Sequence, residues 1–193
     1  MTARTTMASL IATLRGMTNA GATDYTVGSS SYWTDDQLQT VLDRYCLAVY
    51  DELINSAITY ESGGLAKYYD YYSKHRYFET TDGGTARFIV KDSNFDASGT
   101  ANWTADYERG KVSFVADTTG VVYYLTGFSY DLNAAAADVW YQKAAHASEK
   151  IDFQTDNHNI KRSHIAAAAL AMARRYEGLA GQPGSNYMER GDT

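Results

Sequence analysis

The sequence predicts a mainly α-helical fold: a small helical bundle of about four helices with an inserted antiparallel β segment and a flexible C-terminal tail. Apolar residues recur at helical spacing in the first and last thirds of the chain, whereas short β-branched and aromatic runs alternate with turn sequences between them. The end of the chain shows no periodicity. We therefore expect a helical core domain at 1–67 and 129–181, a β insertion at 68–128 and a tail at 182–193.

The first predicted helix covers residues 6–17. Its apolar residues lie one or three positions apart and so occupy one face of a helix: Met7, Leu10, Ile11 and Leu14. Residues 18–31 are rich in Gly, Ser, Thr and Asn, and we expect a loop there.

The second predicted helix has the clearest start signal. Residues 34–37 (Thr-Asp-Asp-Gln) form a capping box, in which the Thr and Gln side chains bond each other's backbone N–H groups. Trp33 and Leu38 have the spacing of a hydrophobic staple. Apolar residues continue at helical spacing, so we expect this helix to run to about Tyr60, before the two glycines at 63–64.

The middle of the chain predicts two hairpins or one small antiparallel sheet. Three runs are short and β-branched or aromatic, at 86–92, 110–117 and 121–128. Turn sequences at 82–84 (Asp-Gly-Gly) and 117–120 (Asp-Thr-Thr-Gly) lie between them.

Two helices follow the β insertion. Asp131 is a suitable N-cap, and a broad apolar stripe from Ala135 to Ile151 predicts the third helix. A polar loop at 152–159 separates it from a fourth helix, which Ser163 could cap. One face of the fourth helix is predicted to carry its packing residues: Ile165, Ala168, Ala169, Met172 and Tyr176.

Composition limits the possible functions. The formal net charge is −6, which argues against a protein that wraps nucleic acid through its phosphates. Cys46 is the only cysteine, so we expect a reduced core thiol and neither an intramolecular disulfide nor a multi-cysteine metal site. The longest late apolar run, 165–173, is too short to span a bilayer, and the N-terminus lacks a signal peptide's apolar stretch. We expect a soluble protein made in the cytoplasm.

No arrangement of residues typical of catalysis stands out. His158 and His164 are six residues apart and would point away from each other on a helix. His146 and Glu149 could share a helix face, but an exposed polar pair explains them more simply than a metal site. Phosphate-binding loops, zinc motifs and serine-hydrolase motifs are absent from the sequence. We therefore expect no catalytic residues, no cofactor and no metal.

Two pairs of residues could contact a partner. Lys161 and Arg162 precede the last helix, where the helix dipole does not favour cations, so an acidic neighbour is a plausible partner. Tyr71 and Tyr72 belong to a Tyr-rich run at 68–72. This run could stack nucleic-acid bases, but packing in a sheet or in a subunit interface explains it more simply.

The helical segments resemble a known family. Residues 130–140 (YDLNAAAADVW), 151–154 (IDFQ) and 161–163 (KRS), with the Ala-rich helix that follows, resemble the last two helices of head–tail connector (adaptor) proteins of tailed bacteriophages. Residues 33–38 (WTDDQL) resemble the opening of that family. The resemblance covers roughly 33–60 and 128–178. Compact members lack the β segment, and this chain resembles longer adaptors that carry an insertion.

The resemblance implies a structural role in the virion. Such proteins form a ring, typically of twelve subunits, beneath the portal. They extend the DNA channel, through which DNA passes without specific binding, and offer a platform for the next neck or tail protein, a stopper or tail terminator. The tail of each subunit reaches into the portal, which points to these portal-docking residues: Gln182, Pro183, Tyr187, Met188, Glu189 and Arg190.

Three other functions compete with the adaptor. A stopper or tail terminator would be predominantly β. A carbohydrate- or nucleic-acid-binding module could use the Tyr-rich β insertion. A small hydrolase would need a nucleophile–base pair, and the sequence shows none.

Overall fold

The computed structural model describes residues 3–21, 25–27, 30–81, 87–148, 153–155, 158–160 and 163–181. The helices, in chain order, are η1 (Thr5–Met7), α1 (Ala8–Thr18), α2 (Asp35–Arg44), η2 (Thr100–Asn102), α3 (Leu132–Ser148) and α4 (Ser163–Glu177). The strands are β1 (Tyr25–Val27), β2 (Ser30–Tyr32), β3 (Cys46–Tyr60), β4 (Ala66–Tyr72), β5 (Phe88–Lys91), β6 (Trp103–Asp106), β7 (Lys111–Phe114), β8 (Tyr123–Tyr130), β9 (Phe153–Thr155) and β10 (His158–Ile160).

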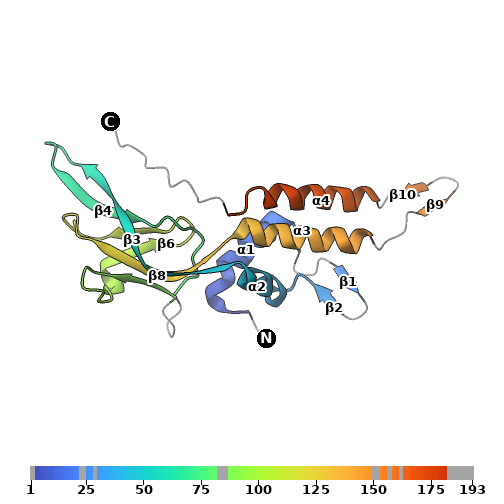
Figure 1. Cartoon of the computed structure of the whole chain (residues 1–193), viewed down its shortest axis with the longest axis horizontal. Helices are drawn as coiled ribbons and strands as arrows, with labels where there is room; N and C mark the ends of the chain where they lie inside the picture. The colour runs from blue at the N-terminus through green and yellow to red at the C-terminus, as the bar shows by residue number, and fades with distance from the viewer. Residues whose placement is uncertain are drawn as a thin grey trace. The chain divides into compact units, whose positions relative to one another are not determined.

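The chain divides into two compact units (Figure 1). The helical unit contains Met1–Tyr45 and Asp131–Gln182, and the sheet unit is built from Cys46–Tyr130. The chain leaves and re-enters the helical unit at adjacent points, because the backbone N–H of Asp131 donates to the carbonyl of Tyr45 over 3.1 Å.

The helical unit packs α1, α2 and α4 against α3. Its buried side chains are mostly those that the helical periodicity selects: Met7, Leu10, Ile11, Leu14, Leu38, Val41, Leu42, Leu132, Ala135 and Val139. The predicted capping box at the start of α2 is confirmed: Thr34 Oγ1 accepts from Gln37 N, and Gln37 Oε1 accepts from Thr34 N.

Side chains of α3 complete the C-terminal end of α1. The indole N–H of Trp140 donates to the carbonyl of Met17 over 3.2 Å, and Lys143 Nζ donates to the carbonyl of Thr18 over 2.9 Å. Asn19 then reverses the chain in the left-handed conformation, at φ 49°. The last carbonyls of α1 lack partners within the helix, so these two donors fix the position of α1 on α3.

The packing face predicted for α4 is only partly correct. Ala169 is buried as expected, whereas Ile165 is 60% exposed and Ala168 is exposed. The buried positions are Ala169 and Ala173, so the contact face is rotated from the predicted one. Small side chains at these positions let α4 lie close along α3, and the two helices run side by side in Figure 1.

The sheet unit contains one antiparallel sheet of six strands in the order β5-β8-β3-β4-β7-β6, curled into a half-barrel. Its concave side holds an apolar core of mainly aromatic and β-branched side chains: Val49, Ile54, Tyr71, Phe78, Phe88, Val90, Trp103, Val112, Phe114 and Leu125. The ring of Tyr71 packs edge-on against Phe114 and Tyr123, at centroid distances of 5.4 and 5.2 Å.

The prediction of a mainly α-helical bundle is wrong, because 30% of the structure is strand against 39% helix, and six of the strands form one antiparallel sheet. The main error is the predicted helix from Thr34 to Tyr60. α2 ends at Arg44, and a strand of fifteen residues starts at Cys46. Apolar residues continue at helical spacing beyond Arg44, but the segment is rich in Val, Ile, Thr and Tyr, and pairing with two other strands decides its conformation.

Two segments predicted as loops contain short antiparallel hairpins. β1 pairs with β2 at the end of the segment 18–31, with Tyr32 just beyond it, and β9 pairs with β10 over 153–160, one residue beyond the segment 152–159. The first part of the helical unit ends at Tyr45, where the prediction has residue 67. The second part starts at Asp131, where the prediction has residue 129. The predicted tail at 182–193 lies outside the described residues.

Replacing Thr34 by Ala is expected to lower the free energy of unfolding by about 1 kcal/mol, since the substitution leaves one N–H at the start of α2 without its partner. Thr40→Ala is the matched control, because Thr40 is exposed in the same helix and bonds only the Asp36 carbonyl there. Chemical denaturation measures both variants. Equal stability of the two would contradict a stabilising role for the cap.

Joining residue 45 to residue 131 through a short Gly-Ser linker is expected to leave a folded helical unit, because the bond between Tyr45 and Asp131 already holds these ends together. Circular dichroism of the shortened chain should show helix and a cooperative thermal transition. Loss of helical signal would mean that the two units share one core.

Candidate functional site

One edge of β3 is open over about half of its length. β8 pairs with Cys46–Ile54 along one edge, and β4 pairs with Asn55–Tyr60 along the opposite edge. β4 ends at Tyr72, and with it the pairing to β3. The chain then crosses to the far edge of β8, where Phe78 forms a bridge with Ser129. Within the described ranges, no strand pairs with the edge of 46–53 that faces away from β8.

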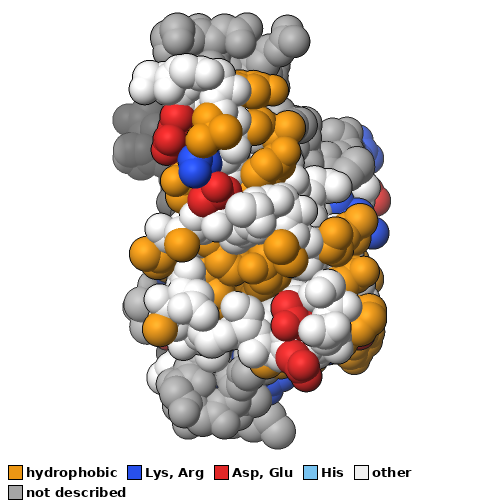
Figure 2. Space-filling model, turned by 90° about the vertical axis from the view of Figure 1, so that its left-hand side faces the viewer, with side chains coloured by type: hydrophobic (Ala, Val, Ile, Leu, Met, Phe, Trp, Pro, Cys, Tyr) orange, Lys and Arg blue, Asp and Glu red, His pale blue; other side chains and the backbone are white. Residues whose placement is uncertain are grey.

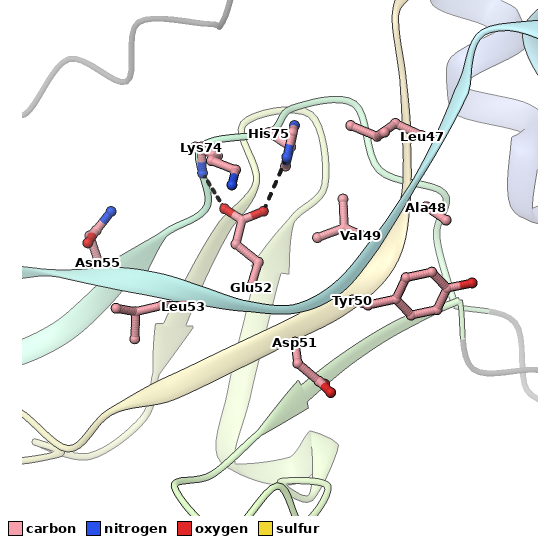
Figure 3. Close-up of a pocket in the computed structure, with 10 residues that line it drawn as sticks. All are labelled: Leu47, Ala48, Val49, Tyr50, Asp51, Glu52, Leu53, Asn55, Lys74 and His75. Atoms are coloured by element: carbon pink, nitrogen blue, oxygen red, sulfur yellow. Dashed lines mark hydrogen bonds and ion pairs between the residues drawn. The ribbon is translucent and has the colours of Figure 1, made fainter.

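A recess of about 460 Å³ lies between this open edge and the crossing segment, which we define as residues 73–79 (Figure 3). β3 supplies most of its wall, and the crossing segment supplies Lys74 and His75. The lining residues are Leu47, Ala48, Val49, Tyr50, Asp51, Glu52, Leu53, Asn55, Lys74 and His75.

In Figure 3 the Glu52 side chain reaches from β3 to the crossing segment, and dashed lines mark its hydrogen bond to Lys74 and its ion pair with His75. Its carboxylate is only 7% exposed, and Oε1 accepts from the backbone N–H of Lys74 at 2.8 Å and from Ser73 Oγ at 3.1 Å. Ser73 Oγ in turn accepts from the backbone N–H of His75 at 2.9 Å. The carboxylate of Glu52 thus takes the place of the ladder hydrogen bonds that end at Asn55 and Tyr72.

The second oxygen of the Glu52 carboxylate is less well satisfied. Oε2 is buried and has no hydrogen-bond partner in the part of the chain that the structure describes. His75 Nε2 lies 3.4 Å away, which is within range for an ion pair when the imidazole is protonated. A buried carboxylate oxygen without a hydrogen-bond donor costs desolvation free energy, which the nearby imidazole offsets when it is protonated.

Ser73, Glu52 and His75 are the residue types of a hydrolase triad, but their geometry differs from one. Ser73 is fully buried, and its hydroxyl donates to Glu52 instead of the imidazole. A nucleophile needs an open approach for substrate, and the fully buried Ser73 has none in this arrangement. The three residues hold the crossing segment against β3.

The crossing segment is fixed at two further points. Glu79 is fully buried; its Oε2 accepts from the hydroxyl of Tyr130 at 2.8 Å, and its Oε1 lies 3.8 Å from Arg87 Nε. Burial of the Tyr130 phenol, together with this bond, raises its pKa far above the ordinary value. At Gly110 (φ 66°) a Cβ atom would lie 2.2 Å from the His75 carbonyl oxygen, so only glycine fits there.

A β-bulge lies on β3 beside the recess. Asp51 has a left-handed conformation at φ 46°, and its backbone N–H donates to Thr126 Oγ1. Its carboxylate accepts from Lys91 Nζ at 2.6 Å and from the Thr126 hydroxyl at 2.8 Å, and these two bonds lower the pKa of Asp51. The bulge inserts one residue, so that Val49 and Ile54, five positions apart, both face the core.

Large apolar side chains remain exposed along β3 and the turn after it. We call them the β3 stripe, and they are between 48% and 74% exposed: Leu47, Tyr50, Leu53, Ile58, Tyr60 and Leu65. Figure 2 looks onto the sheet unit and shows hydrophobic side chains gathered in a band across that face. Exposed apolar surface that is gathered in this way is typical of a protein-contact site.

Tyr71 and Tyr72, which the sequence predicts as partner contacts, do not line the recess. Tyr71 is buried, and its hydroxyl donates to the carbonyl of Val121 at 2.8 Å. Tyr72 is half-buried, with Lys111 Nζ 5.8 Å from its ring centre. Cys46, predicted as a core thiol, is exposed at the start of β3. The ring of His146 stacks on that of Tyr32 at 6.4 Å.

Several predicted contact residues fall outside the described ranges. These are Lys161, Arg162, Gln182, Pro183, Tyr187, Met188, Glu189 and Arg190, together with Glu149, the suggested partner of His146. The sequence predicts neither the open edge nor the bridging role of Glu52, because its apolar residues at helical spacing predict a helix over this segment. A helical interpretation also places Asp51 and Glu52 on a polar face, so no local signal separated the two structures.

No family model matches the chain, and no match was found among curated proteins or solved structures. Among the described helices, none combines the length and apolar character needed to cross a membrane. The described residues also contain no group of three or more His, Cys, Asp or Glu side chains that could hold a metal ion.

Glu52→Ala is expected to lower the free energy of unfolding by about 1–3 kcal/mol, because the buried Ser73 hydroxyl and the Lys74 N–H lose their acceptor. Glu108→Ala, which removes an exposed carboxylate in the same unit, is the control. Urea denaturation followed by tyrosine and tryptophan fluorescence measures both. A neutral Glu52→Ala would show that the crossing segment does not depend on this carboxylate.

Proposed function

We propose that the chain is a structural assembly protein that forms the ring-shaped head-to-tail adaptor beneath the portal of a tailed bacteriophage. The observation that carries the assembly role is the β3 stripe, a row of exposed apolar side chains on the sheet unit. The more specific assignment to a phage adaptor is supported by the resemblance of residues 33–38 and 130–140 to that family.

Six large side chains of the β3 stripe, each with roughly 100 Å² of exposed surface, offer about 600 Å². This area is divided between the two faces of the sheet, because Leu47, Ile58 and Tyr60 lie on the same side of β3 as the core residues and Leu53 lies on the other. A standard protein–protein interface buries roughly 800 Å² on each partner. Neighbouring side chains on the same unit, such as Phe95 and Val115, are also exposed. An isolated subunit would leave this surface in water, and contact with another protein removes it.

A ring requires two different contact surfaces on each subunit, because the interface that closes a ring of more than two copies is heterologous. The β3 stripe on the sheet unit is one candidate. The outer face of α4 is a second, since Ile165, Ala167, Ala168 and Ala171 are exposed there. These side chains are small or apolar, and they allow a neighbouring helix or strand to approach closely.

The charges of the sheet unit suit a protein that DNA passes without specific binding. Three sheet lysines have carboxylate partners: Lys67 with Asp117 at 3.1 Å, Lys91 with Asp51 at 2.6 Å and Lys111 with Asp70 at 2.9 Å. Paired lysines contribute little to phosphate binding, and the net charge of the chain is −6. This distribution favours the adaptor over a nucleic-acid-binding module, the alternative that the Tyr-rich sheet suggests.

The remaining parts of the proposal follow from the family resemblance. The partners are further copies of the chain, typically twelve in a ring, the portal protein, and the stopper or tail terminator that follows. The location is the neck of the virion, after synthesis in the bacterial cytoplasm. No catalytic step, cofactor or metal is part of the proposal, and neither is a membrane.

Purified protein is expected to form rings with a central hole, seen by negative-stain imaging, and to sediment with tail-less, DNA-filled heads that carry a portal. The tail at 182–193 is expected to provide portal attachment through Tyr187 and Met188, so replacing both by Ser should release the protein from heads. Ser185→Ala with Asn186→Ala is the control in the same tail. A protein that stays monomeric and does not bind such heads would contradict the proposed function.

A further inference from the structure

We propose that one end of the sheet unit binds the outer face of α4 in a second copy of this chain. We call this end the far end, because it lies opposite the end where Cys46 begins β3 and Tyr130 ends β8. The inference rests on the proposed ring and names the two surfaces that meet between neighbouring subunits. It is carried by exposed apolar side chains, uncompensated carboxylates and exposed arginines.

The far end is formed by three connections between strands. Each strand is antiparallel to its neighbours, so β3, β5 and β7 run in one direction and finish at the same end of the sheet. The connections that follow these strands are 61–65, 92–102 and 115–122. Side-by-side packing ties them together: the backbone N–H of Thr118 donates to the carbonyl of Tyr68 over 3.0 Å, and Phe95 stacks on Tyr124 at 4.6 Å.

Large apolar side chains are exposed together at the far end. Figure 2 looks onto this end, where hydrophobic side chains form a band with acidic side chains beside it. With roughly 100 Å² each, seven such side chains offer about 700 Å², close to the roughly 800 Å² that each partner buries in a standard interface. They lie on the three connections and on the last residues of β3, and are between 41% and 74% exposed: Ile58, Tyr60, Leu65, Phe95, Val115, Val121 and Val122.

The far end also carries uncompensated negative charge. The nearest cations, Lys67 and Lys91, are already paired with carboxylates. In the part of the chain that the structure describes, the carboxylates of Glu61, Asp92 and Asp96 form no ion pair. Because complementary charges select the partner at an interface, a surface that binds here is both apolar and basic. The phosphates of DNA would be repelled.

The outer face of α4 has this chemistry. Arg174 and Arg175 are exposed, and neither forms an ion pair within the described residues. Ile165, Ala168 and Ala171 are exposed on the same helix, whose buried positions pack on α3. The small side chains let the large apolar groups of the far end approach the helix, and the arginines supply the opposite charge.

A contact between the far end and α4 also has the symmetry that a ring needs. The two surfaces differ and belong to different units of the chain. Each copy therefore offers its far end to one neighbour and its α4 to the other, as a heterologous contact requires. A surface that bound itself would stop at two copies.

Reversal of charge tests the contact in the full chain. One variant carries Glu61→Lys and Asp96→Lys, a second carries Arg174→Glu and Arg175→Glu, and a third combines all four. Sedimentation velocity over a concentration series should show that the first two need roughly tenfold more protein than the wild type for half-assembly. The combined variant, in which both charges are exchanged, should assemble within about threefold of the wild type.

Two controls separate this contact from a general loss of stability or solubility. Asp106→Lys with Glu108→Lys makes the same change of charge at exposed positions near the opposite end of the sheet, and should assemble like the wild type. Leu65→Ser removes an apolar group of the far end and should weaken assembly. Leu47→Ser, at a similarly exposed leucine near the start of β3, should not. Circular dichroism checks that all variants are folded.

Hydrogen–deuterium exchange of the wild type tests the contact without a variant. The amides of 61–65 and 115–122 are expected to exchange roughly tenfold more slowly in rings than in the diluted, dissociated chain. The amides of 106–110, in the turn between β6 and β7, should exchange equally in both forms. This comparison remains decisive if a variant fails to fold.

Four outcomes overturn the inference. Far-end variants that assemble like the wild type, or far-end amides that are equally protected in rings and in the dissociated chain, remove the far end from the subunit contact and leave the ring standing. A combined variant that stays as weak as the first two shows that α4 is not the surface bound. Far-end variants that form normal rings but no longer bind heads assign the far end to another protein. Wild-type protein that never assembles contradicts the ring, and with it the inference.

Discussion

The length of β3 is the constraint on which the sheet unit depends. A strand of fifteen residues has more edge than its neighbours cover, since β8 occupies its first part on one side and β4 its last part on the other. The change of partner happens near Glu52 and Asn55, and the chain crosses the concave side of the sheet there. The curl of the half-barrel, the recess and the buried Glu52 all follow from this single change of partner.

Local rules predicted the elements whose causes are local. The start of α2 follows from four consecutive residues beginning at Thr34, and the structure has the two reciprocal bonds that these residues predict. The end of α2 has no such signal. Positions 45 and 46 are Tyr and Cys rather than Gly or Pro, and the helical spacing of apolar residues continues beyond them. Strand pairing with β8, more than seventy residues later in the chain, decides the conformation of this segment.

The candidate site could not be predicted for the same reason. Glu52 becomes a buried bridge only when Ser73 and Lys74 pass beside it, and nothing around position 52 indicates that approach. The Tyr-rich run lies in a β strand, as the sequence predicts, but its side chains alternate between two environments. Tyr71 is in the core and Tyr72 is on the other face, as the two-residue period of a strand requires.

The hydrogen bond between Tyr45 and Asp131 has a consequence for how the protein is made. The helical unit is discontinuous, because α1 and α2 precede the whole sheet unit and α3 and α4 follow it. At roughly 5–20 residues per second on the ribosome, the 85 residues from Cys46 to Tyr130 take about 4–17 seconds to synthesise. During this time α3 has not been synthesised, so the apolar faces of α1 and α2 that pack on it stay uncovered. The sheet unit is complete before α3 is made, and it therefore folds first. The nascent chain therefore exposes Leu10, Leu14 and Leu42 to chaperones before it completes its helical unit.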